Sequence, residues 1–260
     1  IMSNQDESFL DLLKSSFGLD GLDGQLLIIT HSADALADNF RNLVRFYKDS
    51  HGRTRTACGH SMKMHYDIEK HLIMQFPDIK EAFYARCALL VEGTTESSSM
   101  RLFAETLQVP LDDFGISVID SGGEGSLRKL KTLLGRFGIP CVLVFDADVR
   151  RDGGGNAPNE FYTETLCFET EIAAALSAIG AYDTLDSIVA QMDPQALERP
   201  LSYAYLDKSL QKFGFEGKRV PKSLASLRKN GSELYQMMYA AWLYRNKGAI
   251  LGRIIGDTLP

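Results

Sequence analysis

Short apolar runs alternate with amphipathic segments through the middle of the chain. The runs cover residues 89–91, 115–119 and 141–145, and the segments between them, 96–107 and 124–137, have helical spacing. Strands that alternate with helices of this length predict βαβ units, a parallel sheet and right-handed crossovers. A fourth strand is expected at 163–168, after a Gly-rich loop at 152–158. The pattern therefore predicts an α/β fold whose parallel sheet is flanked by helices.

The two ends of the chain have different patterns. Before the sheet we expect a helix at 6–17, a strand at 26–30, a helix at 34–39 and a strand at 42–47. A polar loop at 48–61 and one or two helices at 67–85 follow. Beyond residue 172 the sequence predicts helices to the end, broken near the prolines at 194 and 200 and across 213–221.

Carboxylates follow two of the predicted strands directly. Glu92 comes after residues 89–91, and Asp146 and Asp148 come after 142–145. The carboxyl ends of parallel strands meet at the edge where open α/β sheets bind their ligands. A single acid there is explained as a helix cap, but three acids that coincide with strand ends are not. Three carboxylates would repel each other without a cation, and an all-oxygen ligand set favours Mg²⁺ or Mn²⁺.

Other acids extend this candidate metal site. Glu96 lies about one helical turn beyond Glu92, so both side chains could face the same ion. Glu169 and Glu171 are two residues apart at the expected end of the fourth strand, where they would share a face. For Glu96 and Glu169, an ordinary first-turn helix carboxylate is an equally good explanation.

Composition limits the classes of protein. The chain has 260 residues, 45% of them hydrophobic, and a formal net charge of −6. Its apolar runs are too short to cross a membrane and no signal peptide is recognised, so we expect a cytoplasmic protein. Three of the four scattered cysteines precede or lie within predicted strands and are expected to be buried thiols, and Cys58 with three nearby histidines matches no zinc pattern.

Basic residues gather between 208 and 229 in an otherwise acidic chain. Lys218, Arg219 and Lys222 lie at the centre of this strip. Such side chains would hold a nucleic-acid backbone without reading its sequence. A solvated helical face explains the strip equally well.

Three motifs resemble a known family. Val91-Glu92-Gly93-Thr94-Thr95-Glu96, the Gly122-Gly123 turn and Asp146-Ala147-Asp148 are together similar to a Toprim domain. The lead-in at 81–90 resembles the version found in OLD (overcoming lysogenization defect) nucleases. Residues 26–32, which end in His31-Ser32, resemble the switch-histidine strand of ABC-type ATPases, and OLD proteins carry such an ATPase ahead of the Toprim domain.

The resemblance implies a two-metal DNA endonuclease or nickase, associated with phage defence or DNA repair. Glu92, Glu96, Asp146 and Asp148 would hold one or two Mg²⁺ or Mn²⁺ ions. Glu171 would be the later acid, with Glu169 competing for that role. Lys247 would support the transition state as a catalytic residue, although an ordinary solvated lysine is an equal alternative.

The resemblance also divides the chain into three parts. Residues 1–60 would be the tail of an ABC-type ATPase domain, 61–175 the Toprim domain, and 176–260 a helical subdomain that completes the nuclease. His31 would contact the γ-phosphate of ATP, but only with the missing ATPase portion, because the chain has no GxxxxGK[ST] loop. We therefore expect no ATP hydrolysis by this chain alone. DNA, a second copy of the chain and an accessory helicase-like protein are the expected partners.

Two alternatives remain open at this stage. Another Toprim enzyme, of the topoisomerase or primase type, would need a catalytic-tyrosine domain or a zinc and polymerase assembly, and neither is recognised here. A non-catalytic regulatory module would need a degenerate metal site, against which the set Glu92, Asp146 and Asp148 argues.

Overall fold

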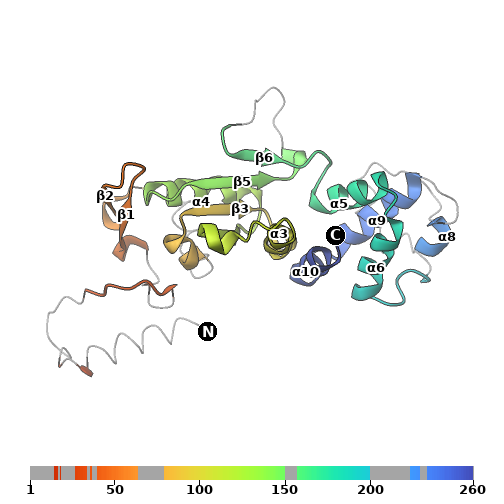
Figure 1. The fold of residues 1–260 in the computed structure, drawn as a ribbon, viewed down its shortest axis with the longest axis horizontal. Coiled ribbons are helices and arrows are strands. Elements are labelled where there is room, and N and C mark those ends of the chain that lie inside the picture. The colour runs from red at the N-terminus through yellow and green to blue at the C-terminus, as the bar shows by residue number, and fades with distance from the viewer. Residues whose placement is uncertain are drawn as a thin grey trace. The chain divides into compact units, whose positions relative to one another are not determined.

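The computed structural model describes residues 15–16, 18, 27–33, 36, 40–63, 79–149, 157–199, 223–228 and 233–259. Figure 1 shows its helices and strands. By its internal contacts the chain divides into two compact units: unit 1 comprises residues 1–88 and 128–141, and unit 2 comprises 89–127 and 142–260. No helix in these described ranges is long and apolar enough to cross a membrane. The three-part division at residues 60 and 175 stays a prediction.

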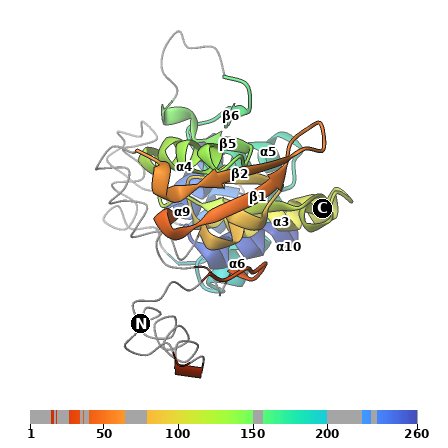
Figure 2. The ribbon, with the colours of Figure 1, turned by 90° about the vertical axis from the view of Figure 1, so that its left-hand side faces the viewer.

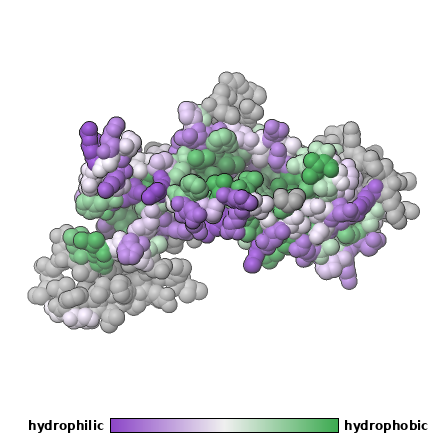
Figure 3. Space-filling model, viewed as in Figure 1, coloured by the Kyte–Doolittle hydropathy of each residue, from purple (hydrophilic) through white to green (hydrophobic). Residues whose placement is uncertain are grey.

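Unit 1 contains an antiparallel hairpin of β1 (Val44–Lys48) and β2 (Thr54–Cys58), visible in Figure 2. In its turn, Oδ1 of Asp49 accepts hydrogen bonds from the backbone N–H groups of His51 and Arg53. The outer end of the hairpin is hydrophilic (Figure 3). The predicted strand at 42–47 is confirmed as β1. The predicted loop at 48–61 is wrong over β2, whose mostly exposed residues give no apolar alternation.

One arginine ties this hairpin to the rest of unit 1. The Arg45 guanidinium donates hydrogen bonds to the carbonyls of Phe83, Ala85, Phe137 and Gly138. The rings of Phe83 and Phe137 pack edge to face beside it, with centroids 4.9 Å apart. Three short 3₁₀ helices also lie in the described part of this unit: η2 (Phe40–Asn42), η3 (Gly59–Ser61) and η4 (Lys80–Tyr84).

The predicted strand at 26–30 is wrong in its described part. Residues 27–30 form no strand, and the side chains of Leu27 and Ile29 are 82% and 94% exposed. An apolar run is stable as a strand only when it pairs with a neighbour and buries a face, and residues 27–30 do neither. His31 follows in an exposed bend of unit 1. The predicted helices at 6–17 and 34–39 and most of those at 67–85 lie outside the described residues. The ATPase assignment of residues 1–60 stays a prediction.

The parallel sheet confirms the predicted α/β fold. Its four strands are β3 (Cys87–Val91), β4 (Ile116–Asp120), β5 (Cys141–Phe145) and β6 (Glu160–Tyr162), in the spatial order β4-β3-β5-β6. Helices α3 (Thr94–Thr106) and α4 (Glu124–Arg136) connect the first three strands. The 3₁₀ helices η5 (Leu111–Phe114) and η6 (Ala147–Val149) lie in the connections after α3 and β5.

The fourth strand begins earlier than the sequence predicted. β6 spans three residues and pairs in parallel with β5, with Phe161 opposite Val144. The predicted strand at 163–168 is wrong, because residues 163–167 form a turn and helix α5 (Phe168–Ala178) begins at residue 168. Thr163 makes this turn: its hydroxyl accepts from Ala147 N–H and donates to the Thr165 carbonyl. Glu169 and Glu171 therefore lie in the first turn of a helix and not on a strand, so their side chains do not share a face.

Helices form the rest of the described part of unit 2, as predicted. After α5 come α6 (Tyr182–Met192), α8 (Leu224–Arg228), α9 (Glu233–Arg245) and α10 (Ala249–Thr258). Their core includes the fully buried Leu185, Met238 and Tyr239. Helix α10 lies directly along α3. A Cβ added at Gly252 would come within 2.2 Å of the Thr95 carbonyl oxygen, so only glycine permits this contact.

Candidate metal centre

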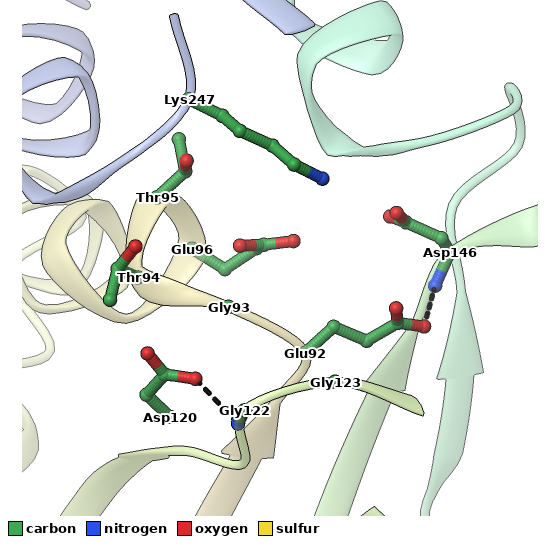
Figure 4. Close-up of a pocket in the computed structure, with 10 residues that line it drawn as sticks. All are labelled: Glu92, Gly93, Thr94, Thr95, Glu96, Asp120, Gly122, Gly123, Asp146 and Lys247. Atoms are coloured by element: carbon green, nitrogen blue, oxygen red, sulfur yellow. Dashed lines mark hydrogen bonds between the residues drawn. The ribbon is translucent and has the colours of Figure 1, made fainter. Parts of the chain in front are cut away.

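A cavity of about 310 Å³ lies in unit 2 at the carboxyl ends of the strands (Figure 4). The end of β3, the start of α3, the turn after β4, the end of β5 and the turn before α10 surround it. The residues that line it are Glu92, Gly93, Thr94, Thr95, Glu96, Asp120, Gly122, Gly123, Asp146 and Lys247. In Figure 4 the side chains of Glu92, Glu96, Asp146 and Lys247 converge on one space.

Glu92 is held at the end of β3 by the neighbouring strand. Its Oε1 accepts a hydrogen bond of 2.9 Å from the backbone N–H of Asp146. Burial raises the pKa of Glu92, and the charges of Asp148 and Glu124 raise it further, whereas the Asp146 N–H and Lys247 oppose the shift. One carboxylate oxygen is thus fixed by the protein.

Glu96 lies in the first turn of α3 and is only 7% exposed. Burial raises its pKa to about 7, and the charges of Glu169 and Asp146 add to the shift. An ordinary first-turn carboxylate on a surface helix remains solvated and is stabilised by the helix dipole. Burial among other acids is instead the environment of a functional carboxylate.

Asp146 follows β5 and is 8% exposed. Its Oδ1 accepts a 2.9 Å hydrogen bond from the backbone N–H of Phe168, the first residue of α5. Burial raises the pKa of Asp146 to about 7, with added repulsion from Glu92 and Glu169. Asp146 therefore joins the sheet edge to the start of the helix that carries Glu169.

Glu169 is the most buried acid of this group. It is 1% exposed, and neither of its carboxylate oxygens has a hydrogen-bond partner. It also acts on the pKa values of Glu96, Asp146 and Lys247, which places its charge beside the cavity. A buried carboxylate without partners is costly, so this environment is suited to a bound cation.

Glu171 has a different environment from the one predicted for a metal ligand. Its Oε2 accepts hydrogen bonds from the backbone N–H groups of Glu164 and Thr165 and from the Thr165 hydroxyl, at 3.1, 2.8 and 2.8 Å. It does not line the cavity. Of the two candidates for the later acid, the structure therefore favours Glu169 and gives Glu171 a role in fixing the loop before α5.

Lys247 lies in the short turn between α9 and α10. Its ammonium nitrogen is 4.6 Å from the centroid of the Tyr244 ring. Burial alone would lower the pKa of Lys247, but the charges of Glu169, Tyr244, Glu96 and Asp146 outweigh this and raise it. A lysine 150 residues from the first acids in sequence is thus their neighbour in space and stays protonated at neutral pH.

The other predicted residues lie elsewhere. Asp148 is exposed in η6 and outside the cavity lining, although its charge acts on Glu92 and Asp146. His31 belongs to unit 1. The residues predicted to contact nucleic acid, Lys218, Arg219 and Lys222, lie outside the described residues.

Sequence reasoning missed two residues that line the cavity. Asp120 ends β4, and its Oδ1 accepts a hydrogen bond from the Gly122 N–H at 2.8 Å. Its position at the end of a third strand, shortly before two glycines, could have identified Asp120 as a site residue. Thr95 is 2% exposed, and its hydroxyl accepts a 2.9 Å hydrogen bond from the Gly248 N–H. Nothing in the sequence indicates that long-range contact.

The donor set fits a hard divalent cation. The converging groups are carboxylates, and the two buried cysteines of the described residues make no zinc-type cluster with them. No three acidic, histidine or cysteine side chains in the described ranges already have the arrangement of a formed metal site. Binding of an ion would require side-chain rotations, and the oxygens of Glu169, which have no hydrogen-bond partner, are available as ligands. All-oxygen ligation favours Mg²⁺ or Mn²⁺.

Parts of the chain are similar to known proteins. The family model "Overcoming lysogenization defect protein-like, TOPRIM domain" matches residues 83–148. Endonuclease GajA of Bacillus cereus (strain HuB5-5) is 25% identical over 167 residues, which cover 58% of this chain and 24% of that protein. The chain thus spans about a quarter of the length of this curated relative.

Solved structures of OLD C-terminal regions are also similar. The one from Xanthomonas campestris pv. campestris is 22% identical with a TM-score of 0.36, and covers 68% of this chain and 93% of its own. The one from Burkholderia pseudomallei is 18% identical with a TM-score of 0.39, and covers 68% and 91%. Residues 83–148 of the chain, which carry Glu92, Glu96 and Asp146, are an overcoming lysogenization defect-like Toprim domain, as the sequence motifs predicted.

Proposed function

We propose that unit 2 is a metal-dependent nuclease that hydrolyses phosphodiester bonds of DNA. The observation that carries this proposal is the convergence of Glu92, Glu96, Asp146 and Lys247 on one cavity. The similarity to an endonuclease supports DNA as the substrate. Acids that are buried together, with raised pKa values, are characteristic of functional sites.

The acids of the cavity would hold the ions. Glu92, Glu96 and Asp146 are the central ligands, Glu169 supplies free oxygens from the side of α5, and Asp148 lies at the rim. When bound, two such ions activate a water molecule and neutralise charge on the leaving 3′-oxygen. The Asp146 N–H orients Glu92, and the Phe168 N–H orients Asp146, so the protein fixes one oxygen of each of these two ligands in advance.

Lys247 contributes a positively charged side chain to the cavity. The surrounding acids raise its pKa, so it remains an ammonium at neutral pH and does not act as a base. A fixed ammonium beside the cavity would stabilise negative charge that develops on the phosphoryl oxygens. Lys247 would therefore bind the scissile phosphate more tightly as the reaction proceeds.

The test is cleavage of supercoiled plasmid in Mg²⁺, Mn²⁺, Ca²⁺ or EDTA. We expect nicked or linear product with Mn²⁺ or Mg²⁺, none with EDTA, and none from Glu92→Gln. Glu105→Gln is the matched control, because Glu105 is exposed at the far end of α3 from Glu96. Intact plasmid in every metal would overturn the proposal. A ladder of closed topoisomers would instead indicate strand passage.

A further inference from the structure

Lys247 occupies a turn that is closed on both sides by hydrogen bonds. On the α9 side, the Asn246 N–H donates to the carbonyls of Trp242 and Leu243, at 3.2 and 3.0 Å, and its side-chain amide donates to Trp242 at 2.8 Å. On the α10 side, the Gly248 N–H donates to the Thr95 hydroxyl at 2.9 Å. Lys247 is the one residue between these two anchors, so its backbone has little freedom.

The Thr95 anchor belongs to the helix that carries Glu96. Thr95 is 2% exposed and adjoins Glu96 in the first turn of α3. The contact between α3 and α10 is tight, since a Cβ at Gly252 would lie 2.2 Å from the Thr95 carbonyl and 2.9 Å from the Ser98 Cβ. The same turn of α3 therefore places an acid in the cavity and fixes the backbone beside the lysine.

The side chain of Lys247 has its own anchor. The Tyr244 ring lies one helical turn earlier, at the end of α9, with its centroid 4.6 Å from the ammonium nitrogen. A lysine ammonium within about 6 Å of an aromatic face is attracted to it. In Figure 4 the side chain extends from the turn toward Glu96 and Asp146. A free lysine side chain would otherwise sample many rotamers.

We propose that Thr95 and Tyr244 are positioning residues that hold Lys247 over the cavity. Thr95 acts through the Gly248 backbone, and Tyr244 acts through its ring. The catalytic consequence rests on the proposed nuclease function, whereas the placement of Lys247 does not. Pre-orienting a charged group lowers the barrier because little reorganisation is needed during the reaction.

The placement is tested first without metal or substrate. The protein in EDTA is treated briefly with acetic anhydride, and mass spectrometry compares acetylation of Lys247 with that of the exposed Lys48 in unit 1. We expect Thr95→Val and Tyr244→Leu to raise the relative labelling of Lys247 severalfold. Thr95→Ser and Tyr244→Phe, which keep the hydroxyl and the ring, should match the wild type.

The catalytic consequence is tested with plasmid nicking in Mn²⁺. Thr95→Val and Tyr244→Leu should lower kcat about tenfold or more and leave KM for DNA nearly unchanged, the pattern of an interaction made in the transition state. Thr95→Ser and Tyr244→Phe should restore kcat. Ser97→Ala is a further control, since the Ser97 hydroxyl is on the same helix and donates a hydrogen bond to the Thr94 carbonyl.

The outcomes separate the two proposals. Labelling that does not change in Thr95→Val and Tyr244→Leu overturns the positioning role, whatever the nuclease assay gives. Changed labelling with no nicking by the wild type supports positioning and overturns the nuclease function. Fluorescence of Trp242, the single tryptophan of the chain, checks that each variant is folded. If Thr95→Val does not fold, the comparison of Tyr244→Leu with Tyr244→Phe tests the positioning role.

Discussion

The substitution Glu96→Gln is expected to stabilise the metal-free protein at alkaline pH. The pKa of Glu96 rises from an ordinary 4.5 to about 7, first because the carboxyl is buried and then because Glu169 and Asp146 repel its charge. Between these two values the folded state keeps a proton that the unfolded chain has lost. Stability therefore falls as pH rises from about 4.5 to about 7, and remains low above that range.

The size of this effect follows from the shift. Each tenfold change in proton affinity corresponds to about 1.4 kcal/mol, so ionised Glu96 costs about 3 kcal/mol of folding free energy at pH 8. Glutamine has nearly the same shape and carries no charge. We expect Glu96→Gln to equal the wild type near pH 4.5 and to exceed it by about 3 kcal/mol at pH 8.

The assay is urea unfolding in EDTA at pH 5 and pH 8, followed by Trp242 fluorescence. Trp242 is 4% exposed, so unfolding changes its surroundings. Glu105→Gln, an exposed change on the same helix, should show no pH-dependent difference from the wild type. A Glu96→Gln variant no more stable than the wild type at pH 8 would refute the argument from burial and repulsion. Excess Mn²⁺ should remove the advantage, because the ion stabilises only the form that binds it.

Four further substitutions test the packing within the two units, each by urea unfolding. Glu171→Ala removes the acceptor of three hydrogen bonds and should lower the free energy of unfolding by about 1–3 kcal/mol. The number of Mn²⁺ ions bound, measured by calorimetry, should not change. Gly252→Ala should cost about 1–3 kcal/mol by overpacking, whereas Gly135→Ala, with open space at its Cβ, should stabilise by about 0.5–1 kcal/mol. A lysine at position 45 cannot donate hydrogen bonds to all four carbonyls. Arg45→Lys should therefore lower the free energy of unfolding by about 2 kcal/mol and speed hydrogen exchange in β1 and β2; unchanged exchange would contradict this.

The strand ends of the Toprim domain were predictable because their signal is local. An apolar run followed at once by an acid indicates both a buried strand and its carboxyl end, which is how Glu92 and Asp146 were found. The alternation with helices then gives the parallel sheet. Glu96 was predictable from helical spacing, since it lies four residues beyond Glu92.

The glutamates after β6 show why part of the site could not be predicted. Two residues apart, Glu169 and Glu171 would share a face on a strand, but on a helix they point in nearly opposite directions. Because α5 begins at Phe168, Glu169 is buried beside the cavity acids and Glu171 contacts the preceding loop. Only the exact start of the helix distinguishes these cases.

Long-range contacts and exposed elements account for the remaining differences. The hydrogen bond from Gly248 to Thr95 joins residues 153 positions apart, and no local pattern encodes it. The β2 strand has few buried residues and so lacks the apolar alternation that marks a half-buried strand. Residues 27–30 have the apolar composition of a strand but are not paired.

The proposed function requires that the acids around this cavity bind divalent cations. Calorimetric titration of Mn²⁺ into the protein at pH 8 tests this requirement, with the double variant Glu92→Gln, Asp146→Asn as the comparison. We expect saturable binding of one or two ions by the wild type, and loss of binding in the double variant. Absence of binding by the folded wild type, or equal binding by both proteins, would contradict it.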